Sequence, residues 1–370
     1  MDHPFRDVDA SYLPPFSDDI ALLILARLPS SKYCDLRLVN RRFRSLIRSG
    51  ELNEIRKKIG LKVPKIFLHS GEARYQCYEP YTRSCWDLPV CPYDETTPYR
   101  ARELFCLGTH LLLLGIINGD CGLCGLQSDS DIWRYELELN RWFNSPMMIT
   151  PRFVFASADC GSVACVAGGE QQGSEEVLNS AEKYNPESKS WESLPSMNRR
   201  RCFCSGLYMD SKFYVIGGIN ENRDLLTCGE CYDFERNVWE LIPNMIEDDP
   251  SRTVLSSQPQ DFVAVVNNEL YYLDVPSRHL KVYLKNNSTW KIVGRAPASI
   301  ELFEGWGVKL KSLGDELVLI CRTLRKHPTL DILMCFCTPS PELDNVEWRV
   351  LEFDRQGRNL FIHNCCVMMA

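Results

Sequence analysis

The pattern of apolar and polar residues divides the chain into a helical head and a long body of strands. In the first 48 residues apolar positions recur three or four apart, which predicts helices near 18–28, 31–38 and 39–48. Pro29 ends the first of these helices. Residues 49–64 predict a short helix and a connector. Beyond the connector, short apolar runs alternate with turn residues, as β-strands require.

The strand region contains one pattern twice between Val163 and Met245. The first copy reads VACVAGG, AEKYNP and SWESLPSM, and the second reads FYVIGG, GECYDF and VWELIPNM. In each copy an apolar run ends in Gly-Gly, and a Tyr precedes a Trp by seven residues. Trp191 and Trp239 are 48 residues apart. A period near fifty residues, with four short strands per unit, indicates the blade of a β-propeller.

The residues that define this pattern resemble kelch repeats. They are Gly168-Gly169, Tyr184 and Trp191 in the first copy, and Gly217-Gly218, Tyr232 and Trp239 in the second. The double glycine allows a tight turn and the close approach of another chain segment. Tyr and Trp supply rigid area between blades, and each has a polar tip that needs a hydrogen-bond partner.

Tryptophan spacing extends the repeat to six units. The six residues Trp86, Trp142, Trp191, Trp239, Trp290 and Trp348 follow one another at steps of 56, 49, 48, 51 and 58. The fold class is therefore mostly β, with a six-bladed kelch propeller over residues 65–370. The first unit lacks an innermost strand. We expect residues 361–370 to supply it and to close the ring, which removes open sheet edges.

The helical head has too much apolar surface for its size. The helix predicted near 18–28 is apolar on nearly all sides, and the segment up to Gly50 has too little mass to cover it. This helix must therefore pack against the propeller or bind another protein.

The block FSDDIALLILARLPSSKYCDLRLVNRRFRSLI (16–47) resembles an F-box. It departs from the family at Phe16-Ser17, where Leu-Pro is usual, and at Phe43, where Trp is usual. We place the F-box domain at 13–50, a helical connector at 51–64 and a disordered terminus at 1–12. The resemblance implies that a Skp-family adaptor, which in turn binds a cullin, contacts the residues Ile20, Ile24, Leu25, Leu28, Pro29, Leu36, Val39 and Phe43. The alternative is a helical cap that packs on the propeller.

Charge is distributed unevenly along the 370 residues. The net charge is −7, but residues 1–62 hold 12 Lys and Arg against 8 Asp and Glu, about +4, which leaves about −11 for the rest. A basic head suggests an acidic partner. The basic run near the connector has no interleaved aromatic residues, so we expect no nucleic-acid binding. No apolar stretch is long enough to span a membrane, and no secretory signal is visible.

The 18 cysteines are expected to be reduced thiols that act as small hydrophobic residues, which places the chain in the cytoplasm or the nucleus. Two C-x-x-C pairs, Cys121/Cys124 and Cys228/Cys231, lie at non-equivalent positions of different repeats. We therefore expect no metal site and no cofactor. Histidines are scattered, and no catalytic motif is present. A copper oxidase of the galactose-oxidase kind shares the kelch blade, but its ligands cannot be assembled here.

Two equivalent loops, ITPRF and NRRRCF, place Arg152 and Arg201 just before innermost strands. Arg200 adds charge beside Arg201. These arginines are candidates for substrate binding, because a guanidinium group recognises carboxylates and stacks on aromatic rings. The alternative is that they only pair with neighbouring acids and backbone. The long loops 118–130 and 170–180 are further candidates.

Resemblance to plant F-box/kelch proteins covers nearly the whole chain. It implies a non-catalytic substrate-recognition subunit of an SCF-type ubiquitin ligase, in which the F-box binds the adaptor and the propeller binds an unknown protein substrate. The alternative is a kelch-type interaction scaffold that acts without a ligase.

Overall fold

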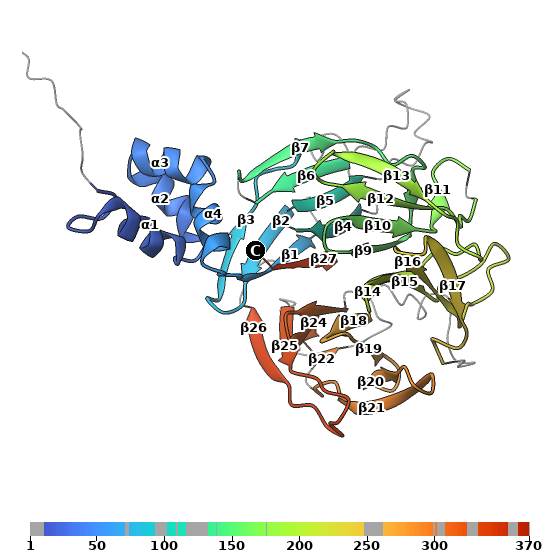
Figure 1. Cartoon of the computed structure of the whole chain (residues 1–370). Helices are drawn as coiled ribbons and strands as arrows, with labels where there is room; N and C mark the ends of the chain where they lie inside the picture. Colours follow the sequence, from blue (N-terminus) through green and yellow to red (C-terminus); the bar gives the residue numbers. More distant parts are fainter. Residues whose placement is uncertain are drawn as a thin grey trace, which may run out of the picture.

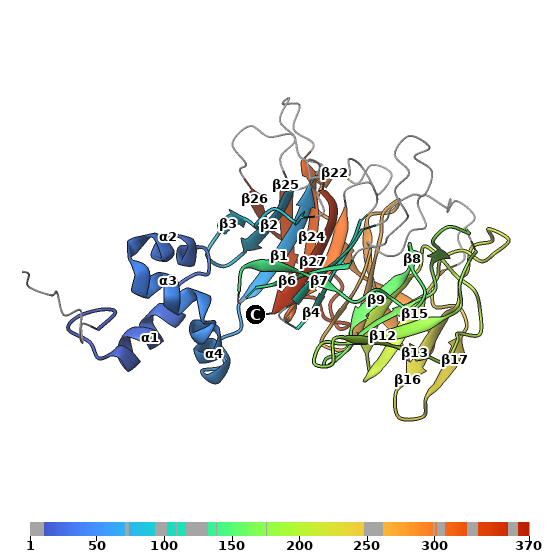
Figure 2. The same cartoon turned by 90° about the horizontal axis from the view of Figure 1, so that it is seen from above.

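A computed structural model describes residues 11–370 except 71–73, 93–101, 109, 116–131, 138, 175, 248–261, 299, 302–307, 324–331, 354–361 and 370. Four helices come first, and a ring of β-sheets follows (Figure 1). The helices project from one edge of the ring, beside its first blade, in both Figure 1 and Figure 2.

The four helices form a small unit with its own core. They are α1 (Asp18–Ala26), α2 (Lys32–Val39), α3 (Arg41–Arg48) and α4 (Glu51–Lys58). We call residues 11–60 the helical module. Its buried core consists of Leu25, Ala26, Phe43, Leu46 and Leu52. Asn40 caps α3, because its side-chain oxygen accepts a hydrogen bond from the Phe43 amide at 2.9 Å.

Residues 11 and 12, which were expected from the sequence to lie in a disordered terminus, belong to the part of the chain that the structure describes. Tyr12 packs edge-on against Phe43, with ring centroids 5.5 Å apart. The Arg42 guanidinium lies 4.0 Å from the Tyr12 ring centre. Residues 1–10 lie outside the described part of the chain.

The ring consists of six four-stranded antiparallel blades. From the innermost strand outward, blade one consists of β27 (Ile362–Met369), β1 (Pro64–Ser70), β2 (Arg74–Glu79) and β3 (Ser84–Asp87). Blade two consists of β4 (Arg102–Leu107), β5 (His110–Gly115), β6 (Ile132–Glu136) and β7 (Arg141–Ser145). Blade three consists of β9 (Ala156–Asp159), β10 (Ala164–Ala167), β12 (Ala181–Asn185) and β13 (Ser190–Leu194). Blade four consists of β14 (Ser205–Met209), β15 (Lys212–Ile216), β16 (Gly229–Asp233) and β17 (Val238–Ile242). Blade five consists of β18 (Val263–Val266), β19 (Glu269–Asp274), β20 (His279–Leu284) and β21 (Thr289–Arg295). Blade six consists of β23 (Lys309–Leu313), β24 (Glu316–Thr323), β25 (Ile332–Cys337) and β26 (Arg349–Phe353).

Three short strands lie outside the blades. β8 (Arg152–Phe153) pairs with β11 (Glu170–Gln171), and β22 (Ile300–Glu301) extends the sheet of blade six at β24. The fold class expected from the sequence, a mostly β six-bladed propeller after a small helical domain, is confirmed.

The C-terminal strand completes the first blade. β27 runs antiparallel to β1, with Cys366 opposite Phe67 and Met368 opposite Lys65. Each of the six inner strands contacts the inner strand of the next blade, and the contact between β23 and β27 completes the circle. Strands from both ends of the chain therefore share one sheet.

Five of the repeated tryptophans connect blades two to six to the blade that precedes each of them. The indole N–H groups donate to backbone carbonyls of the preceding unit at 2.7–3.2 Å: Trp142 to Pro89, Trp191 to Pro146, Trp239 to Pro195, Trp290 to Met245 and Trp348 to Arg295. Within a blade, Tyr184 lies directly opposite Trp191, and Tyr232 lies opposite Trp239. This contact explains the constant spacing of seven residues, because a short hairpin joins the two positions.

The double glycines are required because the backbone of the next loop lies too close to leave room for a side chain. Gly168 and Gly218 have φ of +66° and +87°. A Cβ on Gly168 would lie 2.4 Å from the Arg201 carbonyl oxygen, and one on Gly218 would lie 2.3 Å from that of Cys202. No other residue type fits such a close approach.

A buried polar joint connects the helical module to blade one. Arg56 on α4 donates from Nε to the Ala26 carbonyl at 2.7 Å and from Nη1 to Ser30 Oγ at 2.9 Å. The Ser30 amide donates to Glu79 on β2 at 3.2 Å, and Glu79 pairs with Lys65 at 3.2 Å. Both side chains of this pair are fully buried. The end of α1, the connector helix and the first blade are therefore held in one network.

Candidate functional site

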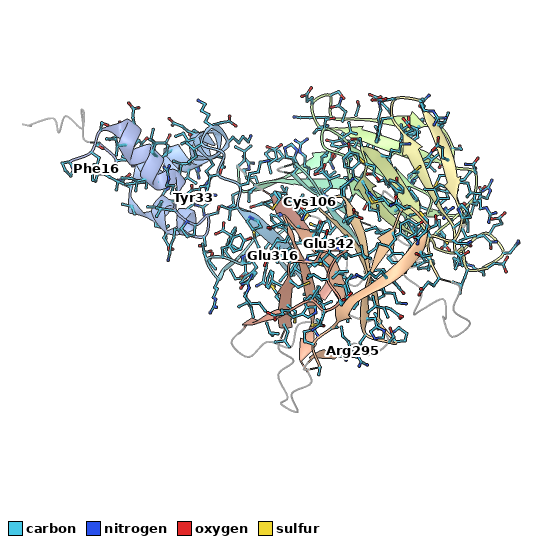
Figure 3. All side chains as sticks on the ribbon, turned by 60° about the horizontal axis from the view of Figure 1, so that its bottom comes forward. Phe16, Tyr33, Cys106, Arg295, Glu316 and Glu342 are labelled. Atoms are coloured by element: carbon cyan, nitrogen blue, oxygen red, sulfur yellow. The ribbon has the colours of Figure 1, made fainter. Side chains whose placement is uncertain are left out.

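The helical module carries an exposed apolar surface on α1 and α2. The exposed fractions are 47% for Ile20, 38% for Ile24, 77% for Leu38 and 63% for Val39. Phe16 is also exposed and lies at the end of the module farther from the propeller (Figure 3). Helix α4 contacts one side of α1, but among the described residues nothing covers these side chains. Exposed apolar clusters of this kind mark interaction sites.

The other predicted adaptor-binding residues have a different position. Leu25 and Phe43 are buried in the core of the module, so they stabilise its fold and are inaccessible to a partner, which corrects their assignment as contact residues. Leu28 and Leu36 are half-buried against the same core. Pro29 is half-buried in the turn after α1.

Helix α3 of the same module carries exposed basic side chains. Arg41, Arg44 and Arg48 on α3 are exposed. Arg42 pairs with Asp18 at 2.7 Å, which joins the start of α3 to the start of α1. The positive charge of the module is therefore available to an acidic partner.

On the propeller, Arg152 and Arg201 are buried, and the expectation that they face a substrate is corrected. Arg152 donates to the Gly168 carbonyl at 3.0 Å and the Ser180 carbonyl at 2.7 Å. Arg201 donates to the Gly217 carbonyl at 3.0 Å and the Cys228 carbonyl at 3.1 Å. Each guanidinium therefore binds backbone carbonyls at the kelch turns, as the alternative interpretation proposed.

Each buried arginine also pairs with a glutamate. The Arg152–Glu182 distance is 2.5 Å and the Arg201–Glu230 distance is 2.9 Å. Glu182 accepts from the Ile149 and Thr150 amides at 2.8 and 2.9 Å, and Glu230 accepts from the Asn198 and Arg199 amides at 2.6 and 3.0 Å. Sequence reasoning missed both glutamates. Their signal was a Glu two residues before the repeat Tyr in both copies.

Arg200 remains at the surface, where it pairs with Glu176 at 2.5 Å and donates to the Val177 carbonyl at 2.7 Å. Nearby, Arg223 pairs with the buried Glu170 at 2.8 Å. The candidate loop 170–180 lies in this region, apart from residue 175, whereas the loop 118–130 lies outside the described residues. Charged side chains from the loops of blades three and four therefore lie at the surface of the propeller.

Comparison with known proteins agrees with both halves of this architecture. The model of the F-box domain matches residues 14–54, and that of the Kelch motif matches residues 166–198 and 200–246. Three F-box/kelch-repeat proteins of Arabidopsis thaliana are 38%, 33% and 34% identical to the chain, over 98%, 96% and 95% of it. The matches cover 85%, 83% and 73% of those proteins. The chain belongs to the F-box/kelch-repeat protein family.

In this F-box/kelch protein the described residues contain no cluster of His, Cys, Asp or Glu that could hold a metal ion. Cys121 and Cys124 lie outside those residues. Cys228 and Cys231 are both buried, and the Cys228 sulfur lies 3.6 Å from Arg201, a cation that would oppose a bound metal. Across the part of the chain that the structure describes, no helix meets the length and hydropathy needed to cross a bilayer.

Proposed function

We propose that this F-box/kelch protein is the substrate-recognition subunit of an SCF-type ubiquitin ligase. The observation that carries the proposal is the exposed apolar surface of Ile20, Ile24, Leu38 and Val39 on an F-box that projects from the edge of the ring. A Skp-family adaptor would cover this surface and connect the chain to a cullin. The basic side chains of α3 would face that adaptor.

The propeller would hold the protein substrate. Because the exposed apolar surface lies on a module beside the ring, an adaptor and a substrate can bind at the same time. The chain would contribute proximity, by holding a substrate lysine near the ubiquitin carrier, and the bond chemistry would occur on other subunits. We expect this assembly to work in the cytoplasm or the nucleus.

The test is capture of a purified plant Skp adaptor by the full chain. Val39→Asp and Ile24→Asp each place a charge in the apolar contact and should weaken capture at least about tenfold, since burying an unpaired charge costs more than 1.4 kcal/mol. Val90→Asp is the matched control, because Val90 is also an exposed apolar residue, at 68% against 63% for Val39, but lies on the propeller.

All three substituted side chains are solvent-exposed, so thermal unfolding should be unchanged. Full adaptor capture by Val39→Asp and Ile24→Asp would rule out the proposed interface. A chain that never retains an adaptor would instead support the scaffold without a ligase.

A further inference from the structure

Cys106 and Cys366 face each other where the two ends of the propeller meet. Their sulfur atoms are 2.8 Å apart, although the residues are separated by 260 positions in sequence. A disulfide bond has a sulfur–sulfur length of about 2.0 Å, so the two atoms need to approach by less than about 1 Å to bond. Both are free thiols in the structure.

The blade geometry fixes this encounter. Cys366 on β27 lies opposite Phe67 on β1, which lies opposite Cys77 on β2, so the three side chains share one face of blade one. That face packs on blade two in a single buried cluster that includes Cys106 on β4. Figure 3 shows Cys106 toward the centre of the propeller. Two inner strands, which contact each other, therefore hold the two thiols.

We propose that Cys106 and Cys366 are an oxidation site, and that their disulfide locks β27 onto blade two. Hydrogen peroxide is the oxidant. One thiolate attacks a peroxide oxygen, which gives a sulfenic acid and hydroxide; the second sulfur then attacks the sulfenic sulfur and releases water. In total, two thiols lose two protons and two electrons, and one peroxide becomes two water molecules.

The position of the bond gives it a structural effect. Strand β27 is held to the ring by hydrogen bonds to β1 and by side-chain packing. A covalent link from β27 to β4 closes a very long loop of chain and opposes separation of β27 from the ring. Cys321 and Cys335 also interact, but they lie on β24 and β25 of blade six, so a bond there would join strands that are already paired.

The surroundings of the pair determine how quickly it reacts. Burial, together with the hydrogen bond to Cys106, raises the pKa of the Cys366 thiol well above its usual value. Little thiolate is present at neutral pH, and the thiolate is the attacking species. Oxidation is therefore slow at pH 7 and faster at pH 9.

The experiment treats the reduced full chain with hydrogen peroxide at pH 7 and pH 9, alkylates the remaining thiols and identifies disulfide-linked peptides by mass spectrometry. We expect a linked pair of peptides that contain Cys106 and Cys366, formed faster at pH 9. The apparent melting temperature should rise by roughly 5 °C, and dithiothreitol should reverse the rise. The melting temperature of each oxidised variant is compared with that of its own reduced form, so a variant that is less stable when reduced can still be scored.

Cys106→Ala and Cys366→Ala should each abolish the rise, whereas Cys335→Ala should retain it. The exposed Cys85 serves as the internal control for peroxide exposure. Oxidation of Cys85 with Cys106 and Cys366 still reduced at pH 9 would overturn the proposal. A rise in melting temperature that survives Cys106→Ala would also overturn it.

Discussion

Arg201 shows how one buried side chain supports the turn between two blades. Its guanidinium binds the Gly217 and Cys228 carbonyls of blade four, while its own carbonyl accepts from the Gly169 amide of blade three at 2.8 Å. The paired Glu230 holds the amides of the same loop. Arg152 and Glu182 repeat this arrangement one blade earlier.

Arg201→Met should therefore destabilise the propeller by about 3–5 kcal/mol, because it leaves Glu230 buried without its counter-charge. Urea unfolding followed by tryptophan fluorescence measures the change. Arg200→Met is the matched control, since Arg200 is surface-exposed and its replacement should stay within about 0.5 kcal/mol. Equal effects of the two substitutions would contradict the structural role assigned to Arg201.

The sequence identified these arginines but could not show where they point. Repeat alignment revealed that Arg152 and Arg201 occupy equivalent positions, and both a surface role and a structural role are compatible with that fact. Whether the arginines are buried or exposed depends on their partners Glu182 and Glu230, which lie about thirty residues away in sequence on β12 and β16. A pairing at that separation becomes visible only once the blades are assembled.

At the scale of elements, the sequence was most informative where spacing reflects direct contact. The Tyr–Trp interval of seven identified blades even where Gly-Gly is absent, because Tyr283 lies opposite Trp290 in blade five as Tyr232 lies opposite Trp239 in blade four. The first helix was harder to interpret. The sequence indicated that this helix has too much apolar surface, but it did not predict that α4 packs against one side of α1. Helix α4 is mainly charged and contributes only Leu52 and Ile55 as apolar side chains to the core of the module.

Strand β27 provides the clearest prediction at this scale. Deletion of residues 361–370 removes the innermost strand of blade one and exposes the edge of β1, so the protein should become insoluble or lose its cooperative thermal transition. Solubility and differential scanning calorimetry measure the outcome. Met369→Ser alters an exposed side chain of the same strand and should leave both properties unchanged. An unaltered melting curve after the deletion would refute this account of ring closure.

At the scale of the whole molecule, the buried joint determines how the helical module sits on the ring. Arg56 places a positive charge at the C-terminal end of α1, where the last backbone carbonyls have no partner within the helix and the helix dipole is negative. Glu79 extends the contact into blade one. The sequence could not predict this joint, because its four polar residues come from four separate segments with no shared motif.

Arg56→Met should loosen the module, since it removes hydrogen bonds from a charged donor that are worth roughly 2 kcal/mol or more. Hydrogen exchange at the Ser30 amide should accelerate, and limited proteolysis between α4 and β1 should become faster. Lys57→Met is the control, because the Lys57 side chain is exposed and pairs with Glu54 on the same helix at 3.0 Å. Unchanged exchange at Ser30 in Arg56→Met would show that the joint does not restrain the module.

The sheet shared by β27 and β1 has a consequence for biosynthesis. A ribosome releases β1 early and β27 roughly 300 residues later, which at about 5–20 residues per second leaves blade one unfinished for some 15–60 seconds. Throughout that interval the F-box is already outside the exit tunnel and able to fold. A nascent chain can therefore present a folded F-box before its propeller is complete.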